Sequence, residues 1–310
     1  LTFVASATAI ALVNGIPVFV DVDPGTFNID PDAMEAAITP QTKAAVVVHN
    51  GGYPADMDRI QAIAQKYGIT IIEDAAHAHG SEWRGKRVGA LSGLGTFSFQ
   101  AFKALTAGEG GAVITNDEEL AQKAFSFHNI GRVAGRPFYE FHRLASNLRM
   151  TEWQAAILLT QLGRLDEQIA TRECNTQYLA KGLQEIPGVA PIARDERVTR
   201  WSFYYWNFLY DSVAFDGVPR DRFLEVMRAE GVPINVGAHG GPIYRNPIFE
   251  TMTDIAGVPV DFREVECPRA EHIFANVALS ITHAAFLGEQ EDMDLILEAV
   301  RKVRANVSEL

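Results

Sequence analysis

Short apolar runs alternate with helix-like segments over the first 150 residues, and this alternation constrains the fold most strongly. A continuous apolar run such as residues 44–49 is typical of a strand buried on both faces of a parallel sheet. Residues 56–67 have helical periodicity, and Gly68 follows them as a C-cap. Further strands are predicted at 18–22, 69–72, 95–100 and 111–115. The pattern predicts an α/β fold with a mostly parallel sheet covered by helices.

The second half of the chain has a different pattern. Residues 151–186 are helical by period, a length that predicts a connecting helix between domains. An aromatic strand and two further helices are predicted after it, at 201–210, 220–230 and 289–306. We therefore expect a large domain at 1–165, and the connecting helix with a smaller α+β domain at 166–310. The chain starts with Leu1 and without a Met, so we expect that an N-terminal part of the large domain is missing.

Composition and charge narrow the class of protein. The 310 residues are 47% hydrophobic and 21% charged, as in a soluble globular enzyme, with a net charge of −12. An acidic chain without an 18-residue apolar run predicts neither nucleic-acid binding nor membrane insertion. Two distant cysteines, Cys174 and Cys267, are typical of a reduced, cytoplasmic protein. His77 and His79 lack a third ligand at suitable spacing, so no metal site is predicted.

Polar residues follow two of the predicted strands. Asp74 comes directly after the strand at 69–72, and ligands of parallel α/β sheets bind at the carboxyl ends of strands. The same carboxylate could instead cap a helix. Lys103 follows the strand that ends near residue 100, where desolvation could lower its pKa and leave a nucleophilic amine. Taken alone, Lys103 could also be an ordinary exposed lysine.

Together these residues indicate a cofactor. Ser98 has a hydroxyl that could donate to a phosphate or satisfy a nearby carbonyl. The glycine-rich run at 107–112 precedes a strand, so it lacks the context of a phosphate-binding loop and predicts a tight turn. A lysine for an imine, an acid for a pyridinium nitrogen and a hydroxyl for a phosphate are the groups that pyridoxal 5'-phosphate (PLP) requires.

Four segments of the sequence resemble the DegT/DnrJ/StrS family of PLP-dependent sugar aminotransferases. They are TFVASATAI at 2–10, EDAAHAHG at 73–80, TFSFQAFKALTAGEGGA at 96–112 and SNLRMTEWQAAI at 146–157. Weaker similarity at 47–58 and 266–273 extends the resemblance over nearly the whole chain. The resemblance implies the fold of the aspartate aminotransferase-like, fold type I enzymes, and a homodimer with active sites shared between subunits.

The resemblance also implies roles for individual residues. Lys103 would form the Schiff base with PLP and move the proton, and Asp74 would pair with the pyridinium nitrogen. His77 stands near the ring's 3' oxygen, where the family usually has Gln. Ser98 would bind the phosphate, and Phe3 would stack on the ring.

Asn147 would reach the phosphate of the cofactor in the partner subunit, by the same resemblance. The family often shows Leu-Pro-x-His-Pro after its last core strand, whereas this chain keeps a histidine, His283, and lacks both prolines. Loops near 132–143 and 237–250 would set specificity, and Arg132, Arg136 and Arg143 could meet a substrate phosphate or only face solvent.

The implied reaction moves an amino group from glutamate or glutamine to a keto group on a nucleotide-linked sugar or a cyclitol. One alternative is an aromatising dehydratase, because His77 and the segments at 165–172 and 281–288 are also similar to 3-amino-5-hydroxybenzoate synthase. Another is a non-catalytic, PLP-binding regulatory protein, although no helix-turn-helix or basic patch is evident. A nicotinamide oxidoreductase is disfavoured because GxGxxG is absent after the first strand.

Overall fold

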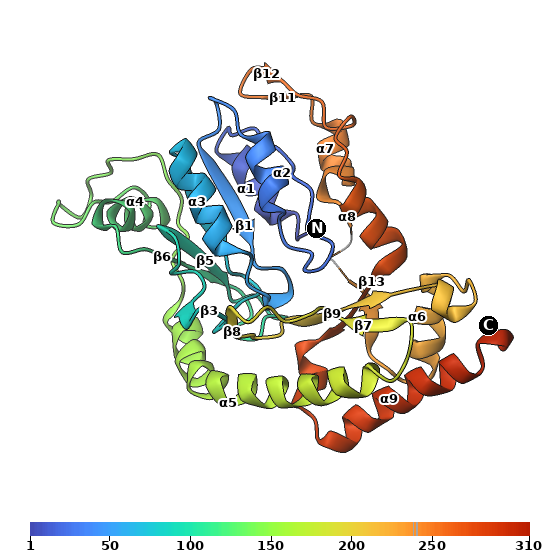
Figure 1. Ribbon diagram of the computed structural model, residues 1–310. Coiled ribbons are helices and arrows are strands. Elements are labelled where there is room, and N and C mark those ends of the chain that lie inside the picture. Colours follow the sequence, from blue (N-terminus) through green and yellow to red (C-terminus); the bar gives the residue numbers. More distant parts are fainter. Residues whose placement is uncertain (238, 240) are drawn as a thin grey trace.

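The computed structural model describes residues 1–237, 239 and 241–310 (Figure 1). The first sheet has the strand order β1-β2-β5-β6. Its strands are β1 (Ala44–Val48), β2 (Thr70–Asp74), β5 (Leu94–Ser98) and β6 (Gly111–Ile114). β1, β2 and β5 run parallel, and β6 is antiparallel to β5. The mostly parallel sheet predicted from the alternating pattern is therefore confirmed.

The prediction of a strand at residues 18–22 was wrong. Only an isolated bridge between Val22 and Ile29 forms there, and the side chain of Val18 is 67% exposed. The carboxylate of Asp21 accepts hydrogen bonds from the backbone N–H groups of Arg269 and Ala270. This segment is therefore held against the C-terminal part of the chain and does not join the first sheet.

Two helices beside the first sheet begin at capping aspartates. The carboxylate of Asp56 accepts the N–H of Arg59 at the start of α3 (Met57–Tyr67), and Gly68 ends the helix with φ of +66°. Asp30 caps α2 (Pro31–Ala37) in the same way, with Pro31 at the first helical position. α1 (Ala5–Leu12), α2 and α3 lie alongside β1 in Figure 1, and α4 (Glu118–His128) follows β6.

One long helix, α5 (Glu152–Leu183), runs beneath both parts of the molecule (Figure 1). It begins with a capping box formed by Thr151 and Gln154. The division predicted at residue 165 falls inside this helix and stays a prediction.

A second, antiparallel sheet follows α5, with the strand order β10-β13-β9-β7. Its strands are β7 (Val189–Pro191), β9 (Tyr205–Tyr210), β10 (Ile234–Val236) and β13 (Ala278–Thr282), and α6 (Arg220–Ala229) and α9 (Gln290–Ala305) accompany them. Shorter elements are β3 (Glu82–Trp83), β4 (Lys86–Arg87), β8 (Val198–Arg200), α7 (Pro247–Thr251), β11 (Asp254–Ile255), β12 (Val258–Pro259) and α8 (Pro268–His272). One main buried cluster extends from Val22 to Val303, so both sheets share a continuous core.

Two features are absent from the part of the chain that the structure describes. No helix among its residues is long and apolar enough to cross a membrane. In the same residues, no group of three or more His, Cys, Asp and Glu side chains is arranged to hold a metal ion.

Candidate active site

The site lies where the carboxyl ends of β2 and β5 meet the start of β9. β2 ends on Glu73 and Asp74, and the side chain of Glu73 is fully buried. Its carboxylate accepts the N–H groups of Gly89, Leu91 and Ser92 at 2.5, 2.8 and 2.6 Å and contacts Nε2 of His49 at 3.2 Å. Burial raises the pKa of Glu73, but the His49 contact and these N–H donors outweigh it and lower the pKa overall. This network fixes the end of the strand that carries Asp74.

Asp74 faces the opposite side of the strand and has a second, unexpected partner. Its Oδ2 accepts the hydroxyl of Ser6 at 2.7 Å, and its Oδ1 accepts the N–H of Ala76 at 3.2 Å. Ser6 belongs to α1, so the segment at 2–10 reaches the site through a hydroxyl as well as through Phe3. Ser6 was not predicted as a site residue, although it lies inside the segment at 2–10 that resembles the family.

Lys103 lies in a turn after β5, with its N–H donating to the carbonyl of Gln100 at 2.9 Å. Its Nζ lies 4.4 Å from the centre of the Tyr204 ring, and Tyr204 is 8% exposed. Burial lowers the pKa of Lys103 to about 8, although the charge of Asp74 acts in the opposite direction. A substantial fraction of this amine is therefore neutral near physiological pH, which is what a nucleophilic or proton-transferring lysine requires.

Two histidines from distant segments meet beside this lysine. His77 and His239 have their Nε2 atoms 2.8 Å apart, and the ring of His77 stacks on Tyr204 at 4.3 Å and 17°. Burial lowers the pKa of His239 to about 4 and that of His77 well below its ordinary value, and the charge of Lys103 acts in the same direction. Both rings are therefore neutral at pH 7, and one of them donates the proton that joins them.

Phe3 and Ser98 lie at the edges of this group. The ring of Phe3 is 6.0 Å from that of His239, and its side chain is 55% exposed. The hydroxyl of Ser98, at the end of β5, accepts the N–H of Gln100 at 3.3 Å and keeps its own proton for another acceptor. Near it, burial lowers the pKa of His79 to about 4, and its ring lies 5.4 Å from that of Phe97.

The two sheets are joined at this site through Asn50. Its Oδ1 accepts the hydroxyl of Tyr205 at 3.0 Å and the amide of Asn207 at 3.2 Å, and its Nδ2 donates to the carbonyl of Leu1 at 2.7 Å. All of these groups are buried or partly buried, so loss of the Asn50 amide would leave the other three without this partner. The Asn50 amide is therefore one of the contacts that fix the relative placement of β1 and β9.

Asn147 lies elsewhere, on the exposed segment between α4 and α5. It forms an isolated bridge with Asn129, and its Oδ1 accepts the N–H of Arg149. The structure thus places five predicted site residues around one region and Asn147 outside it.

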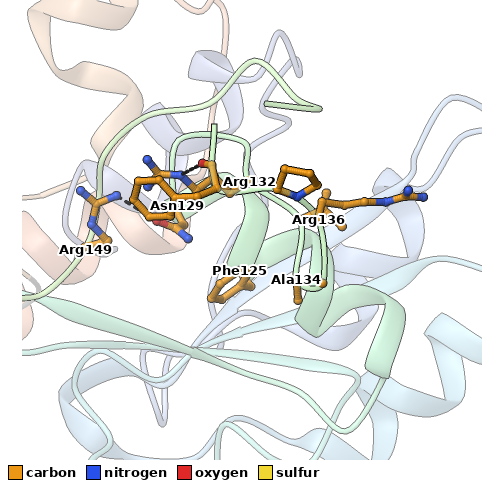
Figure 2. A pocket seen from close by; sticks show the side chains of 10 residues that line it. Phe125, Asn129, Arg132, Ala134, Arg136 and Arg149 are labelled. Atoms are coloured by element: carbon orange, nitrogen blue, oxygen red, sulfur yellow. Dashed lines mark hydrogen bonds between the residues drawn. The ribbon is translucent and has the colours of Figure 1, made fainter. Parts of the chain in front are cut away.

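A hollow of about 460 Å³ lies beside Asn147 rather than at Lys103. Arg132, Arg136 and Arg149 line it, and Figure 2 shows Arg132 and Arg149 next to Asn129 while Arg136 points away from them. Arg149 donates to Oδ1 of Asn129, and Arg132 donates to the carbonyl of Phe138. We place the chemistry at Lys103, because the hollow has guanidinium groups but no nucleophile or general base.

The groups around Lys103 fit PLP. An amine of lowered pKa, a carboxylate and a strand-end hydroxyl lie at neighbouring strand ends, which are the partners required by an aldehyde, a pyridinium nitrogen and a phosphate. Nδ1 of His77 and both ring nitrogens of His79 are buried without a hydrogen-bond partner among the described residues. Buried polar atoms of this kind are expected where a polar ligand completes the site.

Comparisons with known proteins agree with this assignment. A model of the DegT/DnrJ/EryC1/StrS aminotransferase family matches residues 1–301. A putative L-glutamine:3-amino-2,3-dideoxy-scyllo-inosose aminotransferase of Streptomyces kanamyceticus is 38% identical, over 100% of this chain and 76% of that protein. The 3-amino-5-hydroxybenzoate synthase of Amycolatopsis mediterranei is 37% identical, over 97% of this chain and 78% of that protein.

Solved structures are similar over the same extent. The crystal structure of a 3-amino-5-hydroxybenzoic acid synthase matches with a TM-score of 0.87 and 35% identity, covering 98% of this chain and 78% of that one. The structure of DesI, in the presence of its TDP-sugar product, matches with a TM-score of 0.83 and 30% identity, covering 99% and 74%.

Fold and site together define a fold type I transferase of the kind that works with PLP. The chain belongs to the DegT/DnrJ/EryC1/StrS aminotransferase family, and it is an aminotransferase. The predicted fold class and enzyme class are confirmed. The family implies PLP as the cofactor.

Proposed function

We propose that this enzyme uses PLP to move the amino group of glutamine to the ketone of a cyclitol. The observation that carries the proposal is the Lys103 amine, with its pKa lowered to about 8, beside Tyr204 and under the influence of Asp74. The names of relatives at 38–40% identity, which are glutamine:inosose aminotransferases, support the donor and the acceptor. A keto-sugar linked to a nucleotide is the other acceptor class to test, because DesI is a structural neighbour.

PLP, when bound, supplies an aldehyde that takes up an amino group and a ring that withdraws electrons from it. Lys103 would hold the aldehyde and then accept and return a proton at Nζ. Asp74, held by the hydroxyl of Ser6, would keep its carboxylate against the pyridinium nitrogen. The buried, neutral His77 would face the 3' oxygen, Ser98 would bind the phosphate, and Phe3 would cover the ring.

We also propose that the active enzyme is a cytoplasmic homodimer with shared sites. The segment from Phe125 to Leu162, called the outer segment here, exposes many large apolar side chains. Leu144 and Trp153 are 101% and 83% exposed, and patches of this kind mark protein interfaces. A partner chain on this segment would cover them and would bring Asn147 toward the cofactor phosphate of the partner, as the resemblance implies.

Activity of the purified, PLP-loaded enzyme tests the main proposal. We expect glutamine-dependent amination of a scyllo-inosose-type ketone, followed by mass spectrometry of the product, and at least a ~1,000-fold loss of turnover in Lys103→Ala because the nucleophile is removed. Lys66→Ala is the matched control, since Lys66 is exposed and paired with Glu35. Wild-type turnover by the Lys103→Ala variant would contradict the proposal. If the enzyme aminates only a nucleotide-linked keto-sugar, the proposed cyclitol acceptor is wrong.

A second candidate reaction is the aromatising dehydration of a cyclic amino-ketone. The similarity to 3-amino-5-hydroxybenzoate synthases in both sequence and structure favours it. The two reactions are separated by the product, because an aminobenzoate absorbs in the near ultraviolet and an aminocyclitol does not.

A further inference from the structure

A histidine directly after β13 contacts the turn that carries Lys103. Nε2 of His283 lies 3.0 Å from the carbonyl oxygen of Phe102, the residue directly before Lys103. The side chain of Phe102 is 75% exposed and cannot anchor the turn by packing. The contact therefore restrains the backbone of the lysine turn from a part of the chain 181 residues away.

His283 is itself firmly placed. It follows β13, and its N–H donates to the carbonyl of Tyr204 at 3.0 Å, continuing the pairing of β13 with β9. Its ring lies nearly parallel to that of Tyr204, at 6.0 Å and 25°. Tyr204 is the ring on which the amine of Lys103 lies. One residue at the end of β13 thus contacts both the backbone beside Lys103 and the residue whose ring lies beneath its amine.

The protonation state of His283 suits a donor to this carbonyl. Burial and the nearby charge of Arg172 lower the pKa of His283, so the ring is neutral at pH 7. A neutral imidazole carries one proton, and a carbonyl oxygen can only accept, so the proton is on Nε2. Arg172 is 1% exposed, and its Nε donates to the carbonyl of His283 at 3.4 Å, which fixes the backbone of the donor.

We propose that His283 is a positioning residue for Lys103: its Nε2–H holds the carbonyl of Phe102 so that the amine stays over Tyr204 and is ready to capture the cofactor. This inference rests on the proposed function, because it assumes that Lys103 is the residue that captures PLP. It goes further than the proposed function, because it makes the capture of PLP depend on a contact between the turn after β5 and the residue after β13. The roles of the residues that would bind the cofactor do not by themselves assign any role to His283.

Two substitutions separate the hydrogen bond from the packing of the ring. His283→Gln places an amide nitrogen at about the reach of Nε2, whereas His283→Asn ends about where Nδ1 lies. Both remove the imidazole from Tyr204, so both should lower the thermal unfolding temperature of the cofactor-free protein to a similar extent. Only His283→Asn should release the turn.

The measurement is the rate at which cofactor-free protein captures PLP, followed by the visible absorption band as a function of pH. The wild-type rate should rise as pH increases through about 8, where the amine of Lys103 loses its proton. The titratable groups facing this amine are Asp74, His77, His79, His239 and Tyr204. None of them is substituted, so a change in midpoint reports on Lys103.

In His283→Asn, we expect the midpoint to move upward and the rate at pH 7.5 to fall by about tenfold, because a mobile amine is better solvated and more fully protonated. His283→Gln should stay within about threefold of the wild type, since a neutral hydrogen bond of this kind is largely restored. Equal rates in all three proteins, or an equal loss in both variants, would overturn the inference. Wild-type protein that captures no more PLP than Lys103→Ala would overturn the proposed function and this inference together.

Discussion

The surroundings of Lys103 and the outer segment differ in how far a single chain buries their side chains. Around Lys103, His77 and Tyr204 are 2% and 8% exposed, and the carboxylates of Glu73 and Asp74 have partners within the chain. On the outer segment, Trp153 is 83% and Tyr139 is 82% exposed. The difference indicates that folding of one chain prepares the reactive groups, and it fits the proposal that another chain covers the outer segment.

After the loss expected for Lys103→Ala, the largest expected effect is at Asp74. Asp74→Asn keeps the size of the side chain and its contact with Ser6 but removes the charge, so kcat/KM should fall by about 100- to 1,000-fold. Steady-state kinetics with glutamine checks this, and Asp166→Asn, at a side chain 75% exposed, is the control. A loss below threefold would mean that the carboxylate does not face the charged part of the cofactor.

The outer segment should respond through assembly rather than chemistry. Trp153→Glu places a charge where we expect a partner, so the dimer should weaken by at least about 30-fold, as for a central interface residue. Light scattering over a range of concentrations measures this. Leu295→Glu, on α9 and 63% exposed, should leave the mass unchanged. If Trp153→Glu forms a dimer as stable as that of the wild type, the outer segment is not the dimer interface.

The smallest expected effect is on the stability of the cofactor-free protein, when Lys103 is replaced. Burial lowers its pKa from 10.5 to about 8 in the folded protein, so the unfolded chain binds more protons between these values. Stability from this group therefore rises with pH from about 8 to 10.5, and the full cost of the buried charge is present below pH 8. Lys103→Met should make the cofactor-free protein more stable at pH 7 by about 1 kcal/mol after allowance for partial solvation.

Thermal unfolding of Lys103→Met and wild-type protein from pH 7 to pH 10.5 tests this sign. The advantage of the variant should shrink as pH rises. A variant that is less stable at pH 7, or an advantage that grows with pH, would show that the amine is not desolvated as described.

Sequence patterns predicted those parts of the site that depend on neighbouring residues. Asp74 and Lys103 follow apolar strands, and the carboxyl ends of parallel strands share one edge of a sheet, so their proximity was foreseeable. The pairing of His77 with His239 could not be predicted, because 162 residues separate them and no local sequence pattern connects them. The same holds for Ser6, whose hydroxyl reaches Asp74 over 68 residues.

The wrong prediction at residues 18–22 has a related cause. A short run rich in apolar residues indicated a strand, but the backbone there is held by distant contacts between Asp21 and α8. An apolar pattern indicates that a segment has side chains to bury, but it does not indicate which part of the protein they pack against.

The most direct test of the account is to reduce the PLP-loaded wild-type protein with borohydride and locate the modified residue by peptide mass spectrometry. Reduction makes the carbon–nitrogen link between the cofactor aldehyde and its lysine permanent. We expect the phosphopyridoxyl group on the peptide that contains Lys103, and we expect it to be absent in Lys103→Ala. Stoichiometric modification of another lysine, with Lys103 unmodified, would contradict the account.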